Sequence, residues 1–153
     1  MSPDHRIALD NLGSAYRQQK GWDEARKTYG RALQLNPDDA EANYGLGMVF
    51  AQNDDTARAF DSLQRALKLR PVYPEALNNL GILYLRTQRR DEAVATFEEC
   101  IRLAPAFDQA YLNLARVYAI EGTSDKARAV LLDLLKQHPG HAQAQKVMEQ
   151  LGR

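Results

Sequence analysis

The sequence predicts an all-α protein, an α-solenoid of about nine helices stacked as antiparallel pairs. Ala and Leu supply 42 of its 153 residues, and both enter a helix at little cost, whereas Val, Ile and Thr together supply only 15. The second observation is internal repetition with a period of 34 residues. Such a period is typical of stacked helical units, in which each unit contacts only its neighbours.

The prolines show the repeat most clearly. They recur every 34 residues at Pro37, Pro71, Pro105 and Pro139. Proline inside a helix removes a hydrogen bond and clashes with the preceding turn, so each proline is expected to follow the end of a helix pair. Leucines and alanines recur in the same phase: Leu12, Leu46, Leu80 and Leu114, and Ala25, Ala59, Ala93 and Ala127. We therefore expect four copies at 6–39, 40–73, 74–107 and 108–141, within a single domain over 1–153.

Each copy reads as two helices. In the third copy, Leu80 and Tyr84 recur on one helical face, and a polar break follows at 87–90. Ala93 and Phe97 then mark the buried face of a second helix. A small residue stands where the two helices of each copy meet, since a large one would push the backbones apart. These residues are Gly13, Gly47, Gly81 and Ala115.

The two ends of the repeat array differ. Ala144, Val147 and Leu151 form an apolar stripe with glutamines on the other side, which predicts a capping helix at 142–152. At the other end, only residues 1–5 precede the first expected helix, and its Ala8 and Ala15 resemble contact positions for a preceding helix. Two readings stay open: a fragment of a longer array or an end available for stacking, and a small-residue face that is simply exposed.

The motif Leu-Gly-x-x-Tyr, followed by Ala-x-x-x-aromatic and then Pro at period 34, resembles the tetratricopeptide repeat (TPR) family. The resemblance covers 6–141 in four copies, with Phe50 in place of the tyrosine and Leu63 in place of the aromatic residue in the second. It implies a right-handed superhelix whose concave face is lined by the first helix of each copy. In this family the concave groove binds peptides or segments of partner proteins.

Carrying the family's groove positions onto this sequence gives an expected peptide-binding surface. Its residues are Asn11, Ser14, Tyr44, Met48, Asn78, Asn79, Ile82, Arg86, Leu112, Asn113 and Arg116. Several are apolar, which favours a partner helix or hydrophobic segment; the alternative is that some face a neighbouring helix. Three of the asparagines recur in phase, and Gly45 interrupts the series. An asparagine amide can both donate to and accept from a peptide backbone.

Composition and motifs argue against other classes of function. The 20 basic and 20 acidic residues cancel, so no net charge attracts nucleic acid or an anionic membrane. One cysteine, Cys100, allows no internal disulfide, and there is no glycine-rich phosphate loop. His138 and His141 stand in a predicted turn without an acidic neighbour in sequence, so we expect a surface role and no metal site. We expect no catalytic residue and no cofactor.

These observations predict a non-enzymatic scaffold for protein–protein interaction that binds a peptide or helical segment in the groove. The alternatives are a self-assembling module, with a homo-oligomer formed through the N-terminal helix, and a regulatory segment of a larger enzyme. Family members that bind chaperones hold a C-terminal carboxylate with cations, but Asp10 and Glu75 stand at two of those positions here. Like charges repel, so we expect no carboxylate clamp. The N-terminus lacks the pattern of a signal peptide, which favours the cytoplasm.

Overall fold

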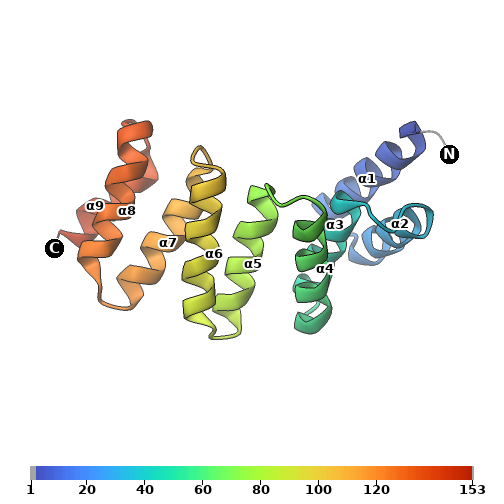
Figure 1. Ribbon diagram of the computed structural model, residues 1–153, viewed down its shortest axis with the longest axis horizontal. Helices are drawn as coiled ribbons and strands as arrows, with labels where there is room; N and C mark the ends of the chain where they lie inside the picture. Colours follow the sequence, from blue (N-terminus) through green and yellow to red (C-terminus); the bar gives the residue numbers. More distant parts are fainter. Residues whose placement is uncertain (1–2, 153) are drawn as a thin grey trace. The chain divides into compact units, whose positions relative to one another are not determined.

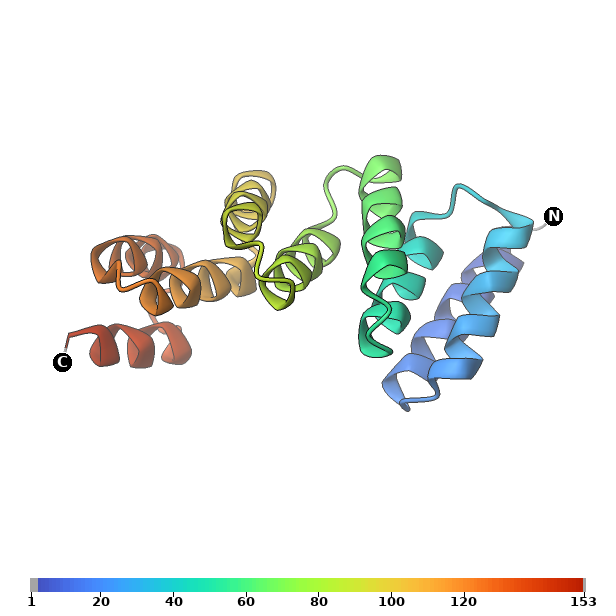
Figure 2. The same ribbon diagram turned by 90° about the horizontal axis from the view of Figure 1, so that it is seen from below.

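The computed structural model describes residues 3–152, with side chains from residue 5 onward, and all regular structure in this span is α-helical. The helices are α1 (Pro3–Gln18), α2 (Trp22–Leu35), α3 (Ala40–Gln52), α4 (Thr56–Leu69), α5 (Pro74–Arg86), α6 (Arg90–Leu103), α7 (Asp108–Ile120), α8 (Ser124–Gln137) and α9 (Ala142–Leu151). Figures 1 and 2 show consecutive helices joined by short turns. The all-α class and the nine helices predicted from the sequence are confirmed for the described residues.

The helix boundaries follow the predicted repeats closely. Helices α3, α5, α7 and α9 begin at residues 40, 74, 108 and 142, and each repeated proline lies two residues after a helix end. The expected start of the first helix at residue 6 is wrong, because α1 begins at Pro3. Proline is favoured in the first turn of a helix, where its missing N–H would have had no helical partner. The first helix is therefore longer than the repeat phase indicated.

The turn inside each helix pair repeats the same backbone geometry. Lys20, Asp54, Gln88 and Gly122 all have positive φ, between 57° and 74°. The residue after each of them donates its N–H to the carbonyl five positions earlier, for example Gly21 to Tyr16 at 2.8 Å and Thr123 to Tyr118 at 2.9 Å. This is the Schellman arrangement that ends helices through one left-handed residue. Three of the four left-handed residues are not glycine.

The chain divides into two compact units, one ending at Leu83 and the other beginning at Tyr84. In the first unit, Tyr29 of α2 is 2% exposed and packs with Leu9 of α1 and with Ala42 and Val49 of α3. The Tyr29 ring lies so close to Gly13 that a Cβ atom there would be 2.6 Å from the ring. Glycine at this position therefore allows α1 and α2 to approach each other.

The core of the second unit is built from α6, α7, α8 and α9. Phe97, Leu131 and Leu134 are fully buried and pack with Leu114 of α7 and Ala144 of α9. Burying a large apolar side chain contributes about 1.5–3 kcal/mol, so these few residues supply much of the unit's stability. The same cluster packs both α7 and α9 against α8.

Candidate functional site

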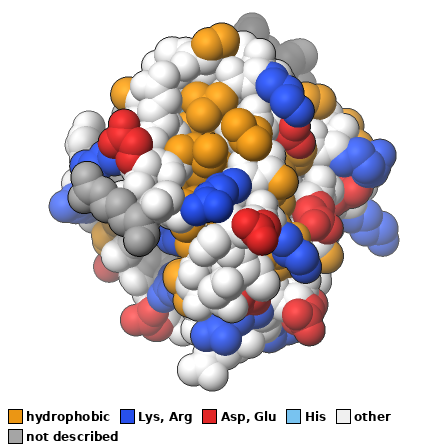
Figure 3. Space-filling model, turned by 90° about the vertical axis from the view of Figure 1, so that its left-hand side faces the viewer, with side chains coloured by type: hydrophobic (Ala, Val, Ile, Leu, Met, Phe, Trp, Pro, Cys, Tyr) orange, Lys and Arg blue, Asp and Glu red, His pale blue; other side chains and the backbone are white. Residues whose placement is uncertain are grey.

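A pocket of about 310 Å³ lies between α7 and α9 in the second unit. Its lining residues are Leu112, Arg116, Ala119, Gln143, Val147, Gln150 and Leu151. Figure 3 looks at the end of the chain that carries α9, where hydrophobic side chains gather near the centre of the face and charged side chains surround them. The volume is at the lower end of the range for ligand pockets, so it suits one or two side chains of a partner.

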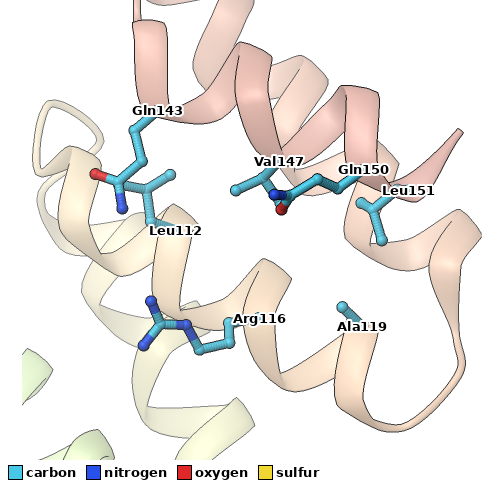
Figure 4. Close-up of a pocket in the computed structure, with 7 residues that line it drawn as sticks. All are labelled: Leu112, Arg116, Ala119, Gln143, Val147, Gln150 and Leu151. Carbon is cyan, nitrogen blue, oxygen red and sulfur yellow. The ribbon is translucent and has the colours of Figure 1, made fainter. Parts of the chain in front are cut away.

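Helical spacing explains how each wall of the pocket forms. Leu112, Arg116 and Ala119 lie four and three residues apart, so they share one face of α7. Gln143 and Val147 are four residues apart on α9 in the same way. Figure 4 shows the side chains of the two helices pointing into the space between them. The pocket is therefore a cleft between α7, the first helix of the fourth copy, and α9, which begins 34 residues later at the corresponding position.

Several contacts hold α9 in place as the second wall. Ala144 is fully buried against the core of the unit. The His141 Nδ1 accepts a hydrogen bond from the Ala144 N–H at 3.2 Å, which caps the helix start. Gln145 donates to the Pro139 carbonyl at 2.8 Å, and Arg128 of α8 donates to the Leu151 carbonyl. Polar contacts thus hold the two ends of α9, and an apolar stripe of Ala144, Val147, Met148 and Leu151 packs the helix against the core.

The pocket has a polar end and an apolar end. Figure 4 places the Arg116 guanidinium near Leu112 and the Gln143 amide, and places Ala119 and Leu151 at the opposite end. Arg116 is exposed, and no carboxylate of the described residues lies within ion-pair distance of it. It is the one charged residue among those lining the pocket. The cleft therefore combines apolar walls with a single available cation.

The first unit presents a different surface, centred on Tyr44 of α3. Its ring centroid lies 4.9 Å from that of Tyr73, and the Arg17 guanidinium lies 5.8 Å from it. Asn79 donates its amide N–H to the Tyr44 hydroxyl oxygen at 3.1 Å. Tyr44 is only 9% exposed, and this burial raises the pKa of its hydroxyl. Tyr44 therefore serves mainly as a packing residue between helices of the first unit.

Buried acidic groups lie beside this surface. Asp39 caps α3 by accepting from the N–H of Glu41 at 3.0 Å, and it pairs with Arg6 at 3.2 Å. Asp10 is 8% exposed, and its Oδ1 has no hydrogen-bond partner among the described residues. Burial, reinforced by the charge of Asp39, raises the pKa of Asp10 to about 6, although Arg6 opposes the shift. The surroundings of Asp10 therefore disfavour its ionised form, which is the form that prevails at neutral pH.

The structure places the eleven expected groove residues in varied environments. Tyr44, Asn78, Leu112 and Asn113 are buried; Ser14, Met48 and Asn79 are half-buried; Asn11, Ile82, Arg86 and Arg116 are exposed. Those up to Ile82 belong to the first unit and the rest to the second. Within the second unit, the pocket brings Leu112 and Arg116 together. Asn113 follows Leu112 on α7 but does not line the pocket.

The in-phase asparagines do not share one environment. Asn11 is exposed, whereas Asn113 is 8% exposed. Asn79 uses its amide N–H groups on the Tyr44 hydroxyl and on the Glu75 carbonyl at 2.8 Å. An amide whose donors are already used has less to offer an incoming peptide backbone. The use of these asparagines as a continuous ladder stays a prediction.

Sequence reasoning missed two features near α9. Gln143 and Gln150 were expected only to cover the helix, but both line the pocket. His138 and His141 have no acidic neighbour in sequence, but the fold places Asp108 2.8 Å from His138 Nδ1 and 3.6 Å from His141 Nε2. The carboxylate belongs to the start of α7, about thirty residues away in sequence, and the fold alone brings it close. No group of described residues is suited to hold a metal ion.

Models of known protein families match most of this sequence. A tetratricopeptide repeat model matches residues 11–74 and 78–142, and a second tetratricopeptide repeat model matches residues 50–99. The chain belongs to the tetratricopeptide repeat family. The resemblance read from the sequence is therefore confirmed, and TPR domains are in general non-catalytic modules for protein interaction. No curated protein resembles this TPR chain closely enough in sequence to count as a match.

Solved structures share the TPR fold with this chain. The crystal structure of MamA has a TM-score of 0.80 and 29% identity, and the similarity covers 93% of this chain and 83% of MamA. PilF of Pseudomonas aeruginosa has a TM-score of 0.86 and 23% identity, covering 97% of this chain and 68% of PilF. YrrB, described as a TPR protein with an unusual peptide-binding site, has a TM-score of 0.72 and 24% identity, and the similarity covers 90% of this chain and 71% of YrrB.

Among the described residues, no helix has both the length and the apolar character that a membrane span requires.

Proposed function

We propose that this TPR chain is a non-enzymatic interaction module that binds a peptide or helical segment of a partner protein in the cleft between α7 and α9. The observation that carries the proposal is the pocket of about 310 Å³ with apolar walls and one available cation, Arg116. Concave sites with mostly apolar linings and a few polar groups are where proteins usually bind ligands. We also propose that residues 1–153 act as one functional domain.

The fold supports the class of ligand. YrrB, which shares the TPR fold with this chain, has a peptide-binding site. The α7–α9 cleft is lined by side chains from two helices, whose labelled residues point into the space between them. Helix-in-groove recognition places apolar anchors at helical spacing into such clefts.

The test uses a peptide display library screened against the whole chain. Binders are then measured by fluorescence anisotropy against the Val147→Trp variant, in which the larger side chain fills the pocket, and against Leu132→Trp as a matched control. Leu132 is 48% exposed on α8 and does not line the pocket. We expect Val147→Trp to weaken binding at least tenfold and Leu132→Trp to leave it unchanged. Equal binding by both variants, with helical circular dichroism retained, would show that the pocket is not the site.

A second candidate function, self-association through α1, rests on a different observation. Leu12 of α1 is 44% exposed, whereas its in-phase counterparts Leu80 and Leu114 are 6% and 2% exposed. In the second unit, Leu114 packs against Phe97 of α6, the helix that precedes α7. An exposed apolar helix face of this kind favours association.

Light scattering as a function of concentration tests the second candidate. We expect an oligomer that dissociates in the Leu12→Glu variant and persists in Leu132→Glu, a matched change at a similarly exposed leucine. A strict monomer for the unmodified chain at millimolar concentration would exclude self-association.

A further inference from the structure

We propose that the α7–α9 pocket selects acidic, aliphatic segments: one aliphatic or aromatic side chain enters the apolar end, and a neighbouring carboxylate binds the Arg116 guanidinium. This inference rests on the proposed function, because it names the partner chemistry of the same site. It commits to a segment of another protein as the occupant. Charge complementarity carries the choice, since the pocket offers one cation and no anion.

The apolar end determines the first requirement on the ligand. Ala119, Val147 and Leu151 supply aliphatic surface from both helices, and Val147 and Leu151 are only half-buried. A side chain that covers them removes their remaining exposed area from water, which contributes roughly 25 cal/mol for each Å². The pocket volume of about 310 Å³ accommodates a Leu, Ile or Phe side chain but not a large cofactor.

The polar end determines the second requirement. Arg116 has no ion-pair partner among the described residues, so a ligand carboxylate displaces no protein acid. A guanidinium presents its N–H groups in a planar fork that matches a carboxylate in two parallel hydrogen bonds. Partly enclosed charge pairs are screened less by salt than fully exposed pairs. The apolar walls beside Arg116 thus favour an acidic ligand over a neutral one.

The two glutamines add a contact that does not depend on the ligand's sequence. Gln143 lies near the Arg116 guanidinium and Gln150 lies midway along the cleft (Figure 4). Each amide has two donors and one acceptor oxygen, which suit the N–H and carbonyl groups of a peptide backbone. The pocket can therefore hold the backbone through Gln143 and Gln150 and read the side chains through Arg116 and the apolar end.

A charge-swap experiment tests the acidic preference with defined probes. Three labelled peptides are compared by fluorescence anisotropy: Ser-Glu-Leu-Phe-Glu-Leu-Ser, its form with both Glu replaced by Gln, and its form with both Glu replaced by Lys. The proteins are the unmodified chain, Arg116→Gln, Arg116→Glu and the control Lys146→Glu. Lys146 lies on α9, is exposed and does not line the pocket, so this control changes the net charge equally.

We expect the unmodified chain to bind the Glu peptide at least tenfold more tightly than the Gln peptide, and expect Arg116→Gln to abolish that difference. Arg116→Glu should reverse the preference so that the Lys peptide binds best, while Lys146→Glu keeps the original order. A reversal by charge swap is a result that a purely structural role for Arg116 would not produce.

Several results would overturn the inference. Equal binding of the Glu and Gln peptides overturns the acidic preference while leaving the proposed peptide site intact. An equal loss in Lys146→Glu would assign the effect to the general field around α9 and not to contact with Arg116. If none of the peptides binds although library peptides do, the ligand class is wrong; if no library peptide binds either, the proposed function itself fails. If self-association shields the pocket from the peptides, its occupant is a second copy of this chain and not a segment of another protein.

Discussion

The ring of Tyr29 occupies the space in which a side chain at residue 45 would begin. A Cβ atom built on Gly45 would lie 2.2 Å from Tyr29 Cζ and 2.5 Å from the neighbouring ring carbons. Tyr29 is 2% exposed, so the ring has little room to move. This contact explains why glycine interrupts the in-phase asparagine series at the second copy.

The first prediction concerns this contact. Gly45→Ala should destabilise the chain by about 2 kcal/mol or more, because overpacking beside a buried ring forces the backbone apart. Gly45→Asn should cost more. Tyr29→Leu introduces the residue that the second and fourth copies carry at this phase, Leu63 and Leu131, and should recover part of the loss in the double variant. Urea unfolding of the four proteins measures the coupling, and strictly additive losses would contradict the steric explanation.

The second prediction concerns pH. Asp10 has its pKa raised from 3.8 to about 6, so between these values the folded chain binds more protons than the unfolded chain. The free energy of unfolding must therefore fall as the pH rises from about 4 to 7, and the loss is complete once the pH is well above the folded-state pKa. Asp10→Asn should remove this slope and stabilise the chain at pH 7 by on the order of 2 kcal/mol. The measurement is the unfolding free energy at each pH.

The exposed acid Asp38 provides the control for the pH prediction. Its side chain is 76% exposed, so Asp38→Asn should leave the slope between pH 4 and 7 as it is. If Asp10→Asn keeps the full slope, the group responsible lies elsewhere. The groups facing Asp10 are Asp39, Arg6 and Glu41.

The third prediction concerns the connection between α3 and the loop before α5. The Tyr73 hydroxyl donates to Glu41 Oε2 at 2.8 Å, and the Arg70 guanidinium lies 3.5 Å from the Tyr73 ring centroid. Burial and the carboxylate both raise the pKa of Tyr73, so the hydroxyl keeps its proton. Tyr73→Phe should destabilise the chain by about 1–2 kcal/mol in thermal unfolding, because the carboxylate loses its donor.

A matched change tests whether the third effect is specific. The Tyr16 hydroxyl makes no hydrogen bond to any described residue, so Tyr16→Phe should alter the melting temperature little. A similar loss in both variants would assign the effect to the ring environment and not to the Glu41 contact.

The fourth prediction concerns the left-handed turn residues. Gln88 has φ of 62°, a conformation that costs a residue with a side chain roughly 1 kcal/mol more than glycine. Gln88→Gly should therefore stabilise the chain by about 0.5–1 kcal/mol. The reciprocal change, Gly122→Gln, should destabilise it by a similar amount, since nothing lies within 4 Å of a Cβ there and only φ of 74° opposes the change. Changes of the same sign in the two variants would refute the backbone explanation.

The sequence predicted the helical repeat well because period and proline placement are local signals. The starts of α3, α5 and α7 follow directly from the 34-residue phase. The start of α1 was missed because Pro3 lies before the first repeat, where no phase applies.

The candidate site was less predictable. Leu112 and Arg116 were expected on a binding face and line the pocket, but α9 was treated only as a cap, so Gln150 was given no role. The apolar stripe of α9 correctly indicated the face that packs against the core, but the distance left between α9 and α7 depends on tertiary packing, which the sequence pattern does not contain. The pairing of Asp108, at the start of α7, with His138, in the turn after α8, joins residues 30 positions apart and leaves no mark in local sequence.

The way α9 is attached sets an upper limit on how tightly the cleft can hold any ligand. Ala144 is its one fully buried residue, and the His141 cap and the Arg128 contact lie at its two ends. Val147, Met148 and Leu151 pack against the core but stay partly exposed, whereas α8 buries Ala127, Leu131 and Leu134 completely. We therefore expect α9 to open at a lower free-energy cost than global unfolding, and its amides to exchange with deuterium before those of α8. Since the cleft exists only while α9 is docked, apparent affinity equals intrinsic affinity multiplied by the docked fraction. Substitutions that tighten the cap can therefore strengthen binding without contacting the ligand.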